Sequence, residues 1–147
     1  MNSDFKELLQ SLSDQKVEYL VVGGYAVIFH AQPRFTKDLD VWVNPDPENA
    51  ANLMKAFVQF GIPLIDIEES DFAKPGTQYM IGVPPVAIDF LTSIPGLEFE
   101  ECWSNRVEDD IDGVPVSYLG KDDLITAKEA AGRDKDREDV HNLKGVP

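Results

Sequence analysis

The chain has 147 residues, of which 43% are hydrophobic, and its 27 acidic and 13 basic residues give a formal net charge of −14. This length and composition predict one globular domain, residues 1–147, and the acidic balance argues against extended duplex nucleic acid as a partner, because such binding needs many Lys or Arg contacts to phosphates. The single cysteine excludes an intramolecular disulfide, and the lack of a membrane-length apolar run or a signal-peptide pattern leads us to expect a cytoplasmic protein without a membrane partner.

The first half of the chain alternates helical and strand patterns. Apolar spacing near the N-terminus and after residue 46 is helical, whereas the valine-rich runs are typical of strands. An aspartate, a proline and a glutamate at positions 46–48 form a helix start, and Gly61 is a helix end. We therefore expect helices over 4–12, 24–31 and 47–60, and strands over 17–22 and 39–43.

The second half predicts further strands followed by two helices. Strand patterns over 77–83 and 86–92 are joined at Pro84-Pro85 and predict a hairpin. A strand is expected over 114–119, where Pro115 indicates an edge position. Helices follow over 121–131 and 134–143, separated by Gly132, while 98–113 shows no clear pattern. The predicted fold class is α/β (α+β): a mixed β-sheet with helices packed mainly on one face and a C-terminal helix pair.

Two aspartates, Asp38 and Asp40, lie one residue apart at the start of the strand expected over 39–43. Residues at i and i+2 of a strand point to the same face, so the two carboxylates project side by side. They repel each other unless a cation lies between them, and Mg²⁺ is the hard cation that oxygen ligands favour. The nearby turn at Gly23-Gly24 lets phosphates approach the backbone closely. Metal with phosphate indicates phosphoryl or nucleotidyl transfer.

A third aspartate, Asp89, lies within an otherwise apolar strand pattern. It is either an edge-strand residue that faces water or a third metal ligand beside Asp38 and Asp40. Three converging carboxylates can hold two Mg²⁺ ions and stabilise the attacking and leaving oxygens of an in-line displacement. In that case the acceptor hydroxyl would lose its proton at Asp89.

The segment that leads into Asp38 contains Arg34 and Thr36. Arg34 is a candidate for a bidentate grip on phosphate, and Thr36 for a hydrogen bond that steadies the metal-binding strand. The alternative is a surface loop in which Arg34 pairs with an acidic side chain.

Charged residues lie on the inward faces of both C-terminal helices. Lys128 falls on the apolar stripe of its helix, and Asp136 and Asp139 share a face with core positions of the last helix. One interpretation is a structural ion pair between Lys128 or Lys135 and one of these aspartates. The other is a lysine that contacts a triphosphate and is held by that network.

Taken together, these motifs resemble the nucleotidyltransferase superfamily with the polymerase-beta-like fold. The hydrophobic-Gly-Gly turn, a thirteen-residue spacer, the Asp-hydrophobic-Asp pair and a later strand aspartate match its signature. The more detailed pattern is similar to the small bacterial branch that includes AbiEii-type toxins and antibiotic nucleotidyltransferases. The segments that carry this similarity are Gly23-Gly24-Tyr25-Ala26, Arg34-x-Thr36-x-Asp38-x-Asp40 and Lys128-x4-Arg133-x-Lys135-Asp136-x2-Asp139.

The resemblance implies roles for the candidate residues. Asp38, Asp40 and Asp89 would be the catalytic, metal-binding residues, with two Mg²⁺ ions as cofactor. The nucleotide would be bound by the glycine turn and by basic and hydroxyl side chains, namely Gly23, Gly24, Arg34, Thr36, Lys128 and Lys135. Gly24 departs from the serine that many members carry there, so a hydroxyl contact to phosphate is missing at this position.

The function that the resemblance implies is Mg²⁺-dependent transfer of a nucleoside monophosphate from an NTP to a hydroxyl, with release of pyrophosphate. The acceptor would be a small molecule, a protein or an RNA end. The alternative is a non-catalytic or toxin–antitoxin-type module with the same fold that acts beside a partner protein.

Overall fold

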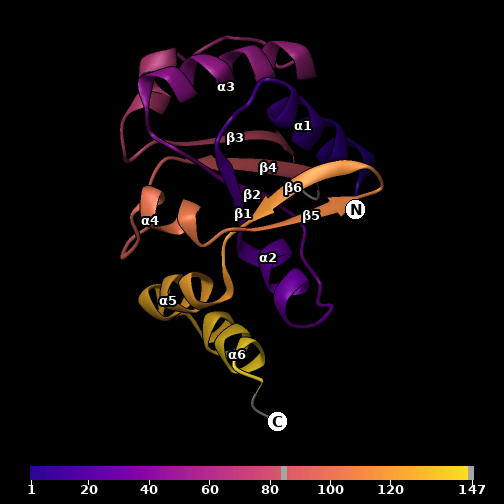
Figure 1. The fold of residues 1–147 in the computed structure, drawn as a ribbon, viewed down its shortest axis with the longest axis vertical. Coiled ribbons are helices and arrows are strands. Elements are labelled where there is room, and N and C mark those ends of the chain that lie inside the picture. Colours follow the sequence, from indigo (N-terminus) through magenta and orange to yellow (C-terminus); the bar gives the residue numbers. More distant parts are fainter. Residues whose placement is uncertain (84–85, 146–147) are drawn as a thin grey trace.

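The computed structural model describes residues 1–83 and 86–145, and six strands in these residues form one mixed sheet (Figure 1). Their order across the sheet is β3-β4-β2-β1-β6-β5. The strands are β1 (Tyr19–Val22), β2 (Leu39–Val43), β3 (Gln78–Val83), β4 (Val86–Leu91), β5 (Val107–Ile111) and β6 (Val114–Tyr118).

The helices lie in two groups around the sheet. In Figure 1, α1 and α3 are seen above the strands, and α2, α5 and α6 below them. The helical segments are α1 (Ser3–Asp14), α2 (Gly23–His30), α3 (Pro47–Phe60), the short 3₁₀ helix η1 (Glu69–Ala73), α4 (Phe99–Ser104), α5 (Lys121–Ala131) and α6 (Asp134–Leu143). None of the described helices is long and apolar enough to cross a membrane.

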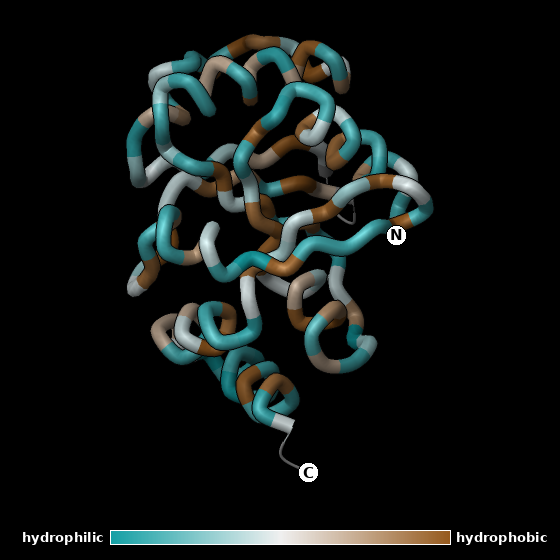
Figure 2. Tube along the Cα trace, viewed as in Figure 1, coloured by the Kyte–Doolittle hydropathy of each residue, from teal (hydrophilic) through white to brown (hydrophobic). Residues whose placement is uncertain are grey.

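Alternation along the central strands gives the sheet one apolar face. Val41 of β2 and Phe90 of β4 are fully buried and are paired in the parallel register of the two strands. Phe90 packs edge-on against Phe57 of α3, with ring centroids 5.0 Å apart. Figure 2 shows that hydrophobic segments gather on the central strands, whereas β5 and α6 are mostly hydrophilic. This face therefore holds much of the hydrophobic core.

The opposite face of the same two strands carries the acidic residues. Asp40 lies between Val41 and Leu39 and points away from them, and its register partner in β4 is Asp89. Further along β2 on this face, Trp42 packs edge-on against Phe99 of α4, with centroids 5.1 Å apart. The pleat thus brings two predicted site residues together from strands about fifty positions apart in the sequence. The predicted fold class, a mixed sheet with a C-terminal helix pair, is confirmed.

Two sequence predictions differ from the structure. The edge position of Pro115 is wrong, because β6 lies between β1 and β5. Proline is tolerated there because β1 is short and pairs with β6 at Tyr118, so no donor to β1 is needed at Pro115.

The unassigned stretch 98–113 contains α4 and β5. β5 is an edge strand with exposed acidic residues, so no apolar alternation marks it. The predicted β3–β4 hairpin pairing is confirmed, while Pro84-Pro85 lies outside the described residues.

Candidate active site

The glycine turn connects β1 to α2 and packs closely against its neighbours. Gly23 has φ +66°, a left-handed conformation that disfavours side chains, and a Cβ there would overlap the carboxylate of Asp40. A Cβ at Gly24 would overlap the hydroxyl of Thr36 and lie 2.8 Å from the Thr36 Cβ. The turn therefore needs both glycines, and it places the unpaired N–H groups of the first turn of α2 beside Asp40 and Thr36.

The three aspartates lie together where β2 and β4 run side by side. Asp38 precedes β2, Asp40 lies within it, and Asp89 is the register partner of Asp40. Asp89 is only 9% exposed, so it is not an edge residue in water. One oxygen of Asp38 and one of Asp89, Oδ1 in both, are buried without a hydrogen-bond partner among the described residues. The other Asp89 oxygen, Oδ2, accepts a hydrogen bond from Gln78 at 2.7 Å.

Burial and neighbouring charge raise the pKa of two of these carboxylates, Asp40 and Asp89. Burial, and then the charges of Asp89 and Asp38, raise the pKa of Asp40 to about 6, against the opposing charges of Lys128 and Lys135. Burial also raises the pKa of Asp89, opposed by the Gln78 hydrogen bond and assisted by Asp38. The carboxylate trio, meaning Asp38, Asp40 and Asp89, is therefore a site of uncompensated negative charge.

The donors of the carboxylate trio suit a hard divalent cation. Carboxylate oxygens are the ligands that Mg²⁺ prefers, and the two partnerless oxygens are free to bind such a cation. Across residues 1–83 and 86–145, no three Asp, Glu, His or Cys side chains already stand in a metal-binding arrangement. The trio fits the cation by chemistry and charge.

A second cluster of buried charges joins α5 and α6 to the loop before β2. Arg34 Nη2 donates to Asp139 Oδ2 at 3.1 Å, and Arg34 Nε lies 3.1 Å from Asp139 Oδ1 without making a hydrogen bond. Lys128 Nζ lies 3.1 Å from Asp139 Oδ2 and 3.4 Å from Asp136 Oδ1. Arg133 Nε donates to Asp136 Oδ2 at 2.7 Å. These five residues form the ion network, in which both aspartates have cationic partners.

The ion network bears on the alternatives that the sequence left open for Lys128 and Arg34, an ion pair or a phosphate contact. Lys128 is 7% exposed, so its inward position is confirmed, and it takes the predicted ion-pair partners while also lining the cleft of the carboxylate trio. Arg34 lines the same cleft, and its guanidinium pairs with an acidic side chain. Burial alone would raise the pKa of Asp136, but the hydrogen bonds and charges of Arg133 and Lys128 hold it below the usual value. The network is electrostatically satisfied.

A cleft of about 580 Å³ unites the predicted residues. It is lined by every candidate from the sequence, namely Gly23, Gly24, Arg34, Thr36, Asp38, Asp40, Asp89, Lys128 and Lys135. Lys135 is exposed, at the first turn of α6. Sequence reasoning did not assign roles to five further lining residues, of which Lys37, Gln78 and Arg133 are polar and Phe35 and Leu91 are apolar. Gln78 was detectable only from strand register, because the pairing of β3 with β4 places it near Asp89.

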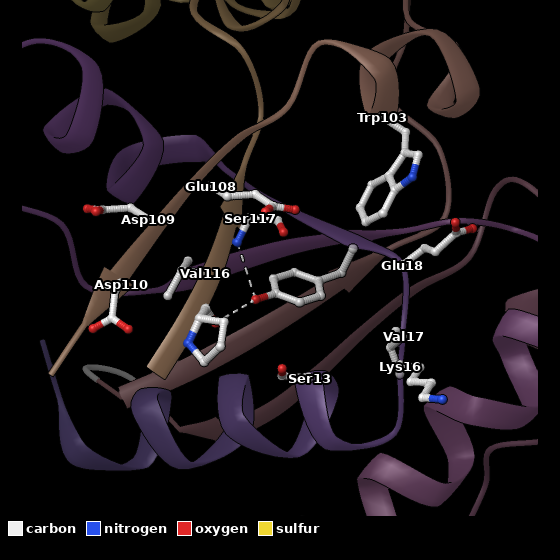
Figure 3. A pocket seen from close by; sticks show the side chains of 12 residues that line it. Ser13, Lys16, Val17, Glu18, Trp103, Glu108, Asp109, Asp110, Val116 and Ser117 are labelled. Carbon is white, nitrogen blue, oxygen red and sulfur yellow. Dashed lines mark hydrogen bonds between the residues drawn. The ribbon is translucent and has the colours of Figure 1, made fainter. Parts of the chain in front are cut away.

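A second cleft, of about 550 Å³, contains none of the predicted residues (Figure 3). It lies between the end of α1, the β5–β6 hairpin and α4, and Figure 3 shows Trp103 and Glu18 at one end and Asp109 and Asp110 at the other. The Tyr19 hydroxyl in its wall is satisfied, since it donates to the Pro115 carbonyl and accepts from the Ser117 N–H. This cleft offers no glycine turn and no basic cluster for phosphate.

Comparisons with known proteins agree with the geometry of the 580 Å³ cleft. Residues 2–144 match a family described as nucleotidyltransferase of unknown function (DUF6036). The chain belongs to this family, and the predicted transferase of the nucleotidyltransferase class is confirmed at that level.

Two solved structures share the fold. The lincosamide antibiotic adenylyltransferase LnuA, with lincomycin bound, is 14% identical with a TM-score of 0.59, and the match covers 100% of this chain and 98% of that one. A Thermotoga maritima protein assigned provisionally as a nucleotidyltransferase is 13% identical with a TM-score of 0.63, covering 97% and 91% of the two chains. At these sequence identities, the structural similarity shows only that the three proteins share a fold. No curated protein sequence matches the chain.

Proposed function

We propose that this protein transfers a nucleoside monophosphate from an NTP to the hydroxyl of an acceptor and releases pyrophosphate. The observation that carries the proposal is the pair of buried, partnerless oxygens on Asp38 and Asp89, beside a glycine turn in a cleft with basic walls. Uncompensated carboxylates next to phosphate-binding groups are what a metal-dependent nucleotidyl transfer needs. When bound, Mg²⁺ at the carboxylate trio would neutralise negative charge on the phosphates.

The glycine turn and the basic walls would hold the triphosphate. The N–H groups at Gly23 and Gly24 point from the first turn of α2, where the helix dipole favours anions. The Thr36 hydroxyl lies where a side chain at position 24 would stand, so it can supply the hydroxyl that Gly24 lacks. Lys128 and Lys135 line the same cleft and would contact phosphate oxygens.

The chemistry would proceed by direct displacement. The acceptor oxygen forms a bond to the α-phosphorus, the bond from that phosphorus to the bridging oxygen of the β-phosphate breaks, and pyrophosphate leaves with the electron pair. Asp89 would accept the hydroxyl proton, a role that its raised pKa suits. Gln78 donates to one Asp89 oxygen, whose second lone pair can take that proton, while the other oxygen stays available to the cation. Arg34, paired to Asp139, would keep the Thr36–Asp38 loop in place.

Incubation with each α-labelled NTP, Mg²⁺ and cell extract tests the proposal. We expect label on an acceptor together with pyrophosphate, and no label with the Asp40→Asn variant. Release of inorganic phosphate from the γ position without any labelled acceptor would instead show a hydrolase. The absence of both products with every NTP would favour the non-catalytic partner module.

A further inference from the structure

A smaller compartment of about 380 Å³ opens from the candidate active site. It shares its floor with the larger cleft, since six residues line both: Gly23, Asp40, Gln78, Leu91, Lys128 and Arg133. It contains neither the Thr36–Asp38 loop nor Lys135. The two spaces therefore adjoin at these six residues, and the compartment extends away from the Thr36–Asp38 loop and Lys135.

The walls of this compartment are mostly hydrophobic. They come from the end of β1, the end of β4 with the segment that follows it, and the inner face of α5, and the apolar residues are Val22, Leu91, Ile94, Pro95, Leu124, Ala127, Ala130 and Ala131. We call this space the apolar compartment. An apolar group that leaves water here is stabilised by burial in proportion to its area.

The charges around the apolar compartment disfavour a cationic ligand. Its two carboxylates are Asp40, in the carboxylate trio, and Asp136, which is already paired with Lys128 and Arg133. Both of these basic residues also line the compartment. Because Asp136 is paired and Asp40 belongs to the trio that would hold Mg²⁺, a cationic ligand would find no free carboxylate here. The hydrophobic walls also leave a strongly hydrated group without compensation for lost water.

We propose that the apolar compartment binds the acceptor, and that the acceptor is an uncharged small molecule with an apolar body next to its hydroxyl. This inference rests on the proposed nucleotidyl transfer. In an in-line displacement, the attacking and leaving oxygens lie on opposite sides of the phosphorus. The leaving pyrophosphate would lie toward Gly24, Lys135 and the Thr36–Asp38 loop, none of which lines the apolar compartment, so the attacking oxygen would approach from the side of the compartment. The compartment can therefore take the acceptor while the larger cleft takes the nucleotide.

Binding of a simple probe, benzyl alcohol, to the whole chain tests this assignment. The amide NMR signals of ¹⁵N-labelled protein are followed while the probe is added, in the presence of Mg²⁺ and an NTP analogue that cannot be cleaved between the α- and β-phosphates. We expect shifts at Ile94, Leu124 and Ala127 that persist when the nucleotide is bound. The cationic alcohol 2-aminoethanol should not shift these signals.

Two matched variants of α5 sharpen the test. Ala127→Leu reduces the space in the apolar compartment and should weaken benzyl alcohol binding about tenfold, with nucleotide affinity unchanged. Thr126→Leu adds the same side chain at an exposed neighbouring position outside the compartment and should change neither affinity.

The possible failures can be told apart. Competition between the nucleotide and benzyl alcohol for the same amides would assign the compartment to the nucleobase and overturn the acceptor role alone. The absence of probe shifts at these residues, or equal binding by Ala127→Leu, would also overturn it. A protein that binds the probe but no nucleotide would overturn the proposed nucleotidyl transfer, and the acceptor role with it.

Discussion

Two clusters of charged residues contribute to the lining of one cleft and differ in how their charges are compensated. In the ion network, Asp136 and Asp139 are 0% and 3% exposed, and cationic groups lie within 3.4 Å of both. In the carboxylate trio, by contrast, Asp38 and Asp89 each keep a buried oxygen without a partner, and the pKa of Asp40 is raised to about 6. A paired cluster supports structure, whereas an unpaired one costs stability unless a ligand compensates it. The comparison therefore separates residues whose charges are paired within the structure from residues that we propose to act on a ligand.

The largest stability change is expected in the ion network. Asp136→Asn replaces a buried anion by a neutral amide and leaves Arg133 and Lys128 partly uncompensated, so the free energy of unfolding should fall by about 3 kcal/mol. Urea unfolding at neutral pH measures this loss. The control is Asp134→Asn, whose 96% exposed side chain pairs with Arg137 at the surface and should change stability by less than about 0.5 kcal/mol. Equal stability of the two variants would remove the structural role of the network.

A smaller loss, combined with a catalytic defect, is expected at the glycine turn. Gly23→Ala places a side chain at φ +66° and should cost about 1–2 kcal/mol of unfolding free energy. It should also displace Asp40 and abolish nucleotidyl transfer.

Gly132→Ala is the matched control for the glycine turn. Gly132 has the same φ of +66°, but a Cβ there meets only the Glu129 carbonyl at an ordinary 3.8 Å. It should lose similar stability and retain activity. An active Gly23→Ala variant would show that close packing of the turn on Asp40 is not needed.

The pH dependence of stability probes the carboxylate trio without any ligand. Because the folded pKa of Asp40 is about 6 and the ordinary pKa of an aspartate is 3.8, the folded state binds a proton between these pH values that the unfolded state has lost. The unfolding free energy due to this group therefore falls as pH rises from about 4 to about 6. Asp40→Asn should be as stable as the wild type near pH 4 and about 1 kcal/mol more stable at neutral pH. Urea unfolding of both proteins across this pH range measures the difference in unfolding free energy. A difference that does not change with pH would contradict the raised pKa of Asp40.

The smallest effect is expected at Thr36. Thr36→Val keeps the β-branched shape beside Gly24 but removes the hydroxyl, so NTP affinity should fall by about 1 kcal/mol, or about fivefold. Calorimetric titration with Mg²⁺ and an uncleavable NTP analogue measures it, with Thr126→Val on the exposed face of α5 as control. Unchanged affinity would place the hydroxyl outside the phosphate contacts.

The apolar alternation of β2 and β4 was predictable from the sequence, because a period of two can be seen within a single strand. That alternation determines which face of the sheet Asp40 and Asp89 point to. The sequence also predicted the inward position of Lys128. The strand β5 escaped prediction because an edge strand exposed to water needs no apolar pattern. Gln78 and the pairing of Arg34 with Asp139 also escaped, since each depends on contacts between elements distant in the chain. Local patterns identified the candidate residues, and tertiary pairing distinguished the compensated charges from the uncompensated ones.

The most direct test of this distinction is the Mg²⁺ dependence of the thermal unfolding midpoint in wild type, Asp40→Asn and Asp139→Asn. A cation that binds only the folded state raises the midpoint by mass action, and about 10 mM Mg²⁺ against KCl of matched ionic strength isolates that binding. We expect the midpoint to rise for the wild type and for Asp139→Asn, although Asp139→Asn starts from a lower value. We expect no rise for Asp40→Asn. A full rise in Asp40→Asn, or its loss in Asp139→Asn alone, would contradict the assignment of the metal site to the carboxylate trio.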